Sequence, residues 1–137
     1  MEGDMTMNNI ESSETTAWDW MQDVRGLDAE LLARMGVTCR DDIVGVPYSR
    51  RGRRYGWKKR TIGKRFWFEP SGAERHLWNR DILDDDTLRE QPVVITEGEI
   101  DALSVMQAGI NRVVSIPDGW TEGMEGGDGA KMRPYRS

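Results

Sequence analysis

The stretch that decides the fold is VVITEGEIDALSVMQAG, residues 93–109. Its first residues are β-branched, as a buried strand prefers. Ile100, Leu103 and Met106 then recur every three residues and line one face of a helix. Gly109 stands where a helix commonly ends in a left-handed residue. The pattern therefore predicts a short buried strand, a glycine turn that carries acidic residues, and an amphipathic helix.

The acidic residues of this turn form a candidate site. Glu97 directly follows the predicted strand, at the edge where α/β sheets tend to place their chemistry. Glu97, Glu99 and Asp101 carry hard oxygen donors, the ligand type that Mg²⁺ prefers. The alternative interpretation is an acidic loop of the kind found between any strand and helix.

A second core strand is predicted over residues 112–116, which read Arg-Val-Val-Ser-Ile. A strand, a helix and a strand of this length favour a right-handed crossover and parallel pairing.

The residues upstream predict a small antiparallel sheet. Three short segments with strand character, residues 43–48, 55–62 and 65–69, are separated by brief turns, so a three-stranded meander is expected. Pro47 should confine the end of the first strand to an edge, because proline has no N–H to donate. Ahead of the sheet, Thr16 and Asp28 suit the starts of two short helices.

Positive charge is concentrated in this predicted sheet. The chain has a net charge of −5, but residues 49–80 hold 11 basic and 2 acidic side chains, a local charge of +9. The overall pI of about 5.0 does not reveal this basic segment, whose charge is suited to binding a polyanion. Lysine and arginine can neutralise phosphates, and aromatic rings between them can stack on exposed bases. The candidate nucleic-acid-binding residues are Arg53, Arg54, Trp57, Lys58, Lys59, Arg60, Lys64, Arg65 and Trp67.

Two alternatives weaken that assignment. Side chains alternate along a strand, so Trp57, Phe66, Trp67 and Phe68 cannot all face one side, and some of these rings belong to the core. The charge cluster itself could be no more than a solvated face.

Composition excludes several classes of protein. A single cysteine, Cys39, leaves no internal disulfide and no four-cysteine zinc site, so we expect no zinc and a reducing, cytoplasmic location. No apolar run approaches the roughly 20 residues that cross a bilayer, and the polar N-terminus lacks the apolar core of a signal peptide. We therefore expect no membrane contact.

The predicted organisation follows from these patterns. It comprises a disordered tail (1–14), a helical segment (15–40), the basic antiparallel sheet (41–80), an acidic linker (81–92), the strand–helix–strand unit (93–119) and a flexible tail (120–137).

The hexapeptide TEGEID, residues 96–101, resembles the first motif of the TOPRIM fold, which primases and topoisomerases share. The sequence of this hexapeptide is most similar to that of phage primase–helicases and their mitochondrial helicase relatives. Lys58-Lys59-Arg60 and Lys64-Arg65-Phe66 also resemble the basic sheet that precedes the TOPRIM strand in that family, and HLWN, residues 76–79, resembles the segment that joins the two. The resemblance covers about residues 27–119. It implies an α/β fold (α+β overall), with N-terminal helices and a small basic sheet followed by a partial TOPRIM unit.

The resemblance also implies roles for particular residues. Glu97 would act with Mg²⁺ near an attacking 3′ hydroxyl, with Asp101 beside it, so these two residues are the metal candidates. Lys58 and Lys64 would hold a triphosphate or the template, which makes Glu97, Asp101, Lys58 and Lys64 the catalytic candidates. The implied partners are single-stranded DNA and a helicase or other replication protein.

The sequence departs from the family pattern in one decisive respect. A TOPRIM enzyme needs a further strand that ends in Asp-x-Asp, and this chain has no such pair; Asp118 and Asp128 are isolated. It also lacks an N-terminal zinc module and a phosphate-cradling loop. We expect a chain that is incomplete at its C-terminus, binds Mg²⁺ weakly or not at all, and is a primase-like nucleotidyltransferase only when completed.

Three functions remain open from the sequence. The first is the front part of a primase–helicase, and the second is a single-stranded DNA-binding module without catalysis. The third is an inhibitor or decoy, encoded by a phage or mobile element, that contacts a replication or defence protein. The only sequence support for the third is the acidic N-terminus and the acidic residues among positions 81–86.

Overall fold

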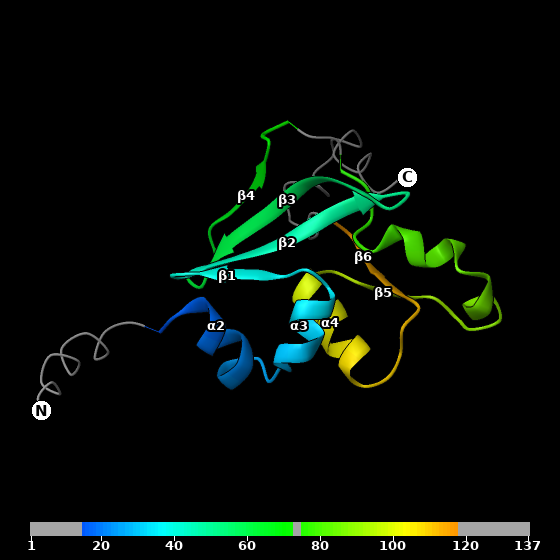
Figure 1. Ribbon diagram of the computed structural model, residues 1–137, viewed down its shortest axis with the longest axis horizontal. Coiled ribbons are helices and arrows are strands. Elements are labelled where there is room, and N and C mark those ends of the chain that lie inside the picture. Colours follow the sequence, from blue (N-terminus) through cyan, green and yellow to red (C-terminus); the bar gives the residue numbers. More distant parts are fainter. Residues whose placement is uncertain (1–14, 73–74, 118–137) are drawn as a thin grey trace, which may run out of the picture.

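The protein is described by a computed structural model over residues 15–72 and 75–117, so the predicted tails lie outside the described residues. A four-stranded sheet lies over the helices, and a second, two-stranded sheet lies beside them (Figure 1). The N-terminal part contains α2 (Ala17–Asp19), the π-helical turn η1 (Trp20–Val24) and α3 (Ala29–Arg34). The larger sheet contains β1 (Thr38–Arg40), β2 (Ile43–Arg50), β3 (Arg53–Thr61) and β4 (Phe66–Glu69). The remaining elements are η2 (Arg80–Asp84), η3 (Asp86–Leu88), β5 (Val94–Thr96), α4 (Glu99–Gln107) and β6 (Val113–Ser115).

The predicted antiparallel meander is confirmed as β2, β3 and β4, which pair in that order. Strand β1 was not predicted and falls inside the expected helical segment 15–40. It pairs with the start of β2 through a tight turn in which Asp41 has a positive φ of 53°. Its three residues show no hydrophobic alternation of their own, so only the pairing with β2 reveals the strand.

The larger sheet has an inner face that packs on the helices and an outer face. Val44, Val46 and Tyr48 of β2 are buried and define the inner face. Directly paired residues of antiparallel strands point to the same side of a sheet. The register therefore brings Lys58, Arg60, Phe66 and Phe68 to the inner face, and Trp57, Lys59, Trp67 and Glu69 to the outer face.

The expectation that Pro47 lies at a sheet edge is confirmed locally, because Pro47 lies in the part of β2 that β1 does not cover. Strand β1 pairs only as far as Gly45, so the side of β2 next to Pro47 has no strand partner. The Pro47 carbonyl points there and accepts a hydrogen bond from Trp78 Nε1 at 2.9 Å. A missing N–H costs nothing at a position that requires only an acceptor.

The strand–helix–strand unit is confirmed. Strands β5 and β6 are parallel, and Ile100, Leu103 and Met106 form the buried face of α4. Gly109 has the expected positive φ, 100°. The predicted burial of the first strand was wrong, since Ile95 is 64% exposed. Strand β5 has β6 as its only partner among the described residues, so one face and one edge stay uncovered. β-Branched residues indicate a strand, whereas the number of neighbouring layers decides its burial.

One hydrophobic core connects the helices, the larger sheet and the strand–helix–strand unit. Trp78, 2% exposed, lies between the two sheets: its indole reaches Pro47, and its backbone N–H donates to the Ser115 carbonyl at 2.8 Å. On the helical side, Gln107 accepts from the Asp28 backbone N–H at 2.7 Å and donates to the Gly26 carbonyl at 2.6 Å. Within the described part of the chain, no helix has the length and apolar character to cross a membrane.

Gly45 offers a direct test of the packing on the outer face. A Cβ at Gly45 would lie 2.7 Å from Thr38 Oγ1 and 3.3 Å from Trp57 Cε3. We expect Gly45→Ala to lower the free energy of unfolding by about 1–3 kcal/mol, because Thr38 must shift and the Trp57 ring must adjust. Urea denaturation measures the loss. Gly63→Ala is the matched control, since its nearest neighbour is Thr61 Oγ1 at 3.8 Å, and equal losses in both variants would contradict the predicted packing.

Candidate nucleic-acid interface

The three acidic residues of the TEGEID motif point to different surroundings. Glu97 is exposed just beyond β5, whereas Glu99 is buried in the first turn of α4. Asp101 is exposed and pairs with Arg25, Nη2 to Oδ1, at 3.5 Å. Over residues 15–72 and 75–117, no three side chains of histidine, cysteine, aspartate or glutamate gather in a way that could hold a metal ion. The Mg²⁺ site predicted at Glu97 and Asp101 therefore remains a prediction.

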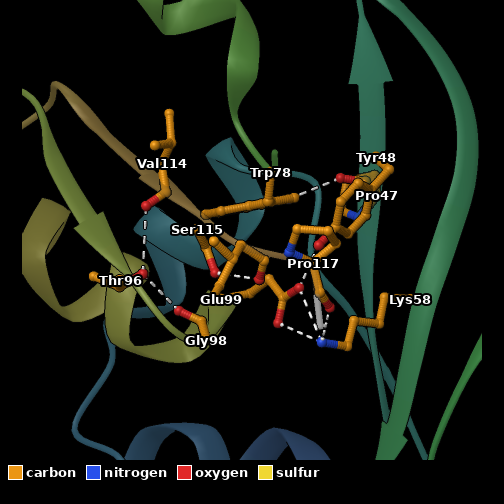
Figure 2. A network of polar contacts seen from close by, with 11 residues as sticks. Pro47, Tyr48, Lys58, Trp78, Thr96, Gly98, Glu99, Val114, Ser115 and Pro117 are labelled. Carbon is orange, nitrogen blue, oxygen red and sulfur yellow. Dashed lines mark hydrogen bonds and ion pairs between the residues drawn. The ribbon is translucent and has the colours of Figure 1, made fainter. Parts of the chain in front are cut away.

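Glu99 is the centre of a buried polar network (Figure 2). Lys58 Nζ lies 3.2 Å from both carboxylate oxygens of Glu99 and 2.7 Å from the Pro117 carbonyl oxygen. The Tyr48 hydroxyl donates to Glu99 Oε2. The Lys58 and Glu99 side chains are only 10% and 8% exposed. The network thus connects β2 and β3 to the start of α4 and to Pro117, two residues after β6.

This geometry favours a structural role for Lys58. A buried charge is costly unless it is paired and hydrogen-bonded, and Lys58 and Glu99 satisfy each other. The carboxylate of Glu99 also lies in the first turn of α4, where the helix dipole favours negative charge. For Lys58 to hold a triphosphate or template, as the family resemblance implies, its ammonium would first have to leave Glu99.

Sequence analysis missed the role of Glu99, although a signal was present. Glu99 precedes Ala102, Leu103 and Met106 by three, four and seven residues, and those three residues are buried. Positions with this spacing share one helix face. Glu99 was therefore placed on the buried face of α4 by periodicity, and a buried carboxylate requires a partner.

Arg60 is the second cation on the inner face. Its guanidinium carbon lies 4.7 Å from the ring centroid of Trp20 and 5.2 Å from that of Phe66. It also donates to the carbonyls of Thr61 at 3.0 Å and Ile62 at 3.3 Å. Burial, and then the charge of Arg25, hold the pKa of Arg60 below its ordinary value, while Glu99 opposes them. Arg60 is thus half-buried between two aromatic rings.

Phe66 gives this inner-face cluster an exposed aromatic surface. Its side chain is 52% exposed, and Lys58 Nζ lies 5.1 Å from its ring centroid. The ring is therefore flanked by Lys58 and Arg60, on the side of the sheet where α4 begins. An exposed ring between cations is an arrangement that can stack on a base while neighbouring charges contact phosphates.

Other predicted binding residues lie elsewhere. Trp57, Lys59 and Trp67 are on the outer face by register. The guanidinium carbons of Arg54 and Arg65 lie 5.1 Å and 5.9 Å from the ring centroids of Trp57 and Trp67, respectively.

Two further candidates are at strand ends. Lys64 is exposed, with a positive φ of 76°, in the turn between β3 and β4, and Arg53 is exposed at the start of β3. The structure therefore divides the predicted binding residues between two faces and the turns of one sheet.

Comparison with known proteins supports the predicted α/β fold and the predicted resemblance to replication proteins. No family model matches the chain. The solved structure of the DnaG catalytic core superimposes with a TM-score of 0.54 at 18% sequence identity, covering 81% of this chain and 53% of that one. At this level of identity the match concerns the fold alone, and it supports the predicted α/β fold.

A curated relative gives the sequence counterpart. The chain is 35% identical over 77 residues to the Twinkle homolog protein, chloroplastic/mitochondrial, of Arabidopsis thaliana. That match covers 56% of this chain and 10% of the relative, so the chain spans about a tenth of the relative's length. The predicted resemblance to TOPRIM primase–helicases is thereby confirmed in both sequence and fold, and it points to primase- or helicase-like replication proteins.

The Lys58–Glu99 pair predicts a large, coupled effect on stability. Lys58→Met or Glu99→Gln alone should lower the free energy of unfolding by about 3–5 kcal/mol, because each leaves a buried group without its charged partner. The double variant should lose less than the sum of the two single losses. Urea denaturation of the four proteins measures the coupling. Lys59→Met is the control on the same strand: its partner Glu69 is half-exposed, so a loss of at most about 1 kcal/mol is expected. Additive losses would contradict the assigned pairing.

Proposed function

We propose that this chain is the front part of a TOPRIM primase–helicase-type replication protein, and that its basic sheet binds single-stranded DNA. The observation that carries the proposal is the arrangement of β3 and β4, where aromatic rings alternate with cations on both faces of the sheet. Cations supply contacts to phosphates, and the rings supply stacking that does not depend on sequence. A helicase or other replication protein is the protein partner that such a module would serve.

We further propose that the chain does not synthesise primers by itself. Glu97 is exposed, and neither Glu99 nor Asp101 joins it, since each is paired with a cation. Additional carboxylates from outside the described residues would be required for a Mg²⁺ site and for nucleotidyl transfer. Val93, just before β5, and Ile95 within β5 are exposed, which is consistent with apolar surface that further parts of a larger protein would cover. Binding of Mg²⁺ by this chain alone is therefore expected to be weak or absent.

The inhibitor or decoy hypothesis receives no specific support. Asp81 accepts hydrogen bonds from the backbone N–H groups of Arg51 and Gly52, both at 2.8 Å, and so holds the β2–β3 turn. Asp85 caps η3, and its hydrogen bonds from the Thr87 side chain and backbone lower the pKa of its carboxyl. These carboxylates are used within the chain. We therefore favour DNA binding over the inhibitor hypothesis. The cytoplasmic location remains a prediction.

The first experiment is fluorescence anisotropy of a labelled single-stranded oligonucleotide over a salt series. We expect affinity to fall steeply with salt, and we expect Lys64→Glu/Arg65→Glu to weaken binding and flatten the slope of log K against log salt by about 1–2. Both residues are exposed at the turn that begins β4.

The matched control for that experiment is Arg34→Glu/Arg89→Glu. It makes the same change in net charge at exposed residues of the helical side and of the segment after η3. An equal loss in both double variants would mean that overall charge, not the sheet, controls binding. No binding even at low salt would overturn the proposed function.

The acidic residues give a separate prediction. Glu97→Gln/Asp101→Asn should leave DNA affinity unchanged or slightly higher, because it removes repulsion of phosphates and releases Arg25 from Asp101. Addition of Mg²⁺ at constant ionic strength should have little effect on either protein. The same anisotropy titration tests both points. A clear loss of binding in the variant, or a strong requirement for Mg²⁺, would count against the proposal.

A further inference from the structure

We propose that the outer face of the larger sheet is a second, separate track for single-stranded DNA, with Trp57 and Trp67 as its base-stacking rings. The inference rests on the proposed function, DNA binding, and adds a surface on the side of the sheet opposite to α4 and the Lys58–Glu99 network. No described helix covers this face, whereas α2, α3 and α4 lie on the other side of the sheet (Figure 1).

The register sets the positions of the two rings. Trp57 pairs with Glu69, and Lys59 pairs with Trp67, so the two tryptophans are diagonal neighbours on adjacent strands. Diagonal neighbours are about 7–8 Å apart, close to twice the 3.4 Å spacing of stacked bases. An unstacked single strand can span that interval and place one base on each ring.

Trp57 is held against the sheet and is partly exposed. A Cβ on Gly45 would lie 3.3 Å from Trp57 Cε3 and 3.4 Å from Lys59 Cε, so the ring edge and the lysine stem lie over a glycine. Arg54 and Lys59 lie 5.1 Å and 5.9 Å from the Trp57 ring centroid. Trp57 is half-buried, so its position is fixed before any ligand arrives, and less ordering is required on binding.

Trp67 is fixed in a different way. Its Nε1 donates to Glu69 Oε2 at 2.9 Å, and Lys59 Nζ lies 3.2 Å from Glu69 Oε1. The Trp67 hydrogen bond, and then the Lys59 hydrogen bond, lower the pKa of the Glu69 carboxyl, so it remains ionised at neutral pH. Its negative charge is thus compensated locally while it orients the ring.

Charge on this face favours a polyanion. Glu69 is the one carboxylate among the residues of β1–β4 that the register assigns to the outer face, and it is already paired with Lys59. The cations of this face are Arg40, Arg54, Lys59 and Arg65. The hydrophobic core lies entirely on the inner side and includes neither tryptophan. Two fixed rings with excess positive charge, on a face that the core does not use, match the chemistry of single-stranded DNA better than that of an apolar protein partner.

Substitutions can separate stacking from simple bulk. Trp57→Leu/Trp67→Leu should weaken binding of an oligothymidylate by about tenfold or more for each ring, whereas Trp57→Phe/Trp67→Phe should retain most of the affinity. Trp18→Leu is the matched control, since Trp18 is exposed on α2 on the helical side. Phe66→Leu reports on the inner face. Urea midpoints of all variants establish that each is folded.

Photocrosslinking of the unmodified protein keeps the test decisive if the leucine variants unfold. Single-stranded DNA with 5-iodouracil should crosslink to Trp57 or Trp67, as identified by mass spectrometry. Crosslinks confined to Phe66 or Trp20, or full affinity in the folded leucine double variant, would overturn the outer track and leave the proposed function intact. Absence of DNA binding in the salt series would overturn both. A protein captured on this face with no DNA affinity would likewise reject the track.

Discussion

The fold depends on the neutralisation of cations that strand alternation directs toward the interior. Strand β3 is rich in lysine and arginine, and its pairing with β2 sends Lys58 and Arg60 to the face that packs on the helices. The structure accommodates these two cations in different ways. Lys58 meets a buried carboxylate, Glu99, supported by Tyr48 and the Pro117 carbonyl, whereas Arg60 lies between Trp20 and Phe66. Replacing such a pair by well-packed apolar groups is often neutral or stabilising, so its retention is consistent with a role in fixing how the two parts of the molecule meet.

The Lys58–Glu99 pair also limits which carboxylates of the TEGEID motif are exposed. Glu99 pairs with Lys58 and Asp101 pairs with Arg25, so within residues 15–72 and 75–117 Glu97 is the carboxylate of the TEGEID motif that forms no ion pair. The motif thus serves two purposes in one turn of helix: one carboxylate joins the sheet to α4, and another remains exposed at the end of β5. The predicted resemblance to TOPRIM primase–helicases thus extends to fold and local sequence, whereas only one carboxylate of the motif is exposed without an ion pair among the described residues.

The alternation that buries Lys58 also produces the two-sided character of the sheet. Every residue that turns inward on β3 or β4 leaves a neighbour facing outward, so one strand contributes both the buried network and the Trp57–Lys59 surface. Gly45 on β2 favours this arrangement, since a Cβ there would lie 2.7 Å from Thr38 Oγ1 and 3.3 Å from Trp57 Cε3. The structure therefore explains why aromatic residues and cations are interleaved so densely in residues 50–69.

The sequence by itself determined the strand–helix–strand unit, the antiparallel meander, the basic character of the sheet and the position of Glu97 after β5. These features depend on periodicity, turn residues and local charge, which short segments carry on their own. Only the tertiary structure decided that β1 pairs with β2, that the Pro47 carbonyl meets Trp78, that Ile95 is exposed, and that Lys58 pairs with Glu99. The physical reason is common to all four: each depends on which partner lies opposite in space, and residues 41 positions apart in the chain, such as Lys58 and Glu99, reveal no pairing through local pattern.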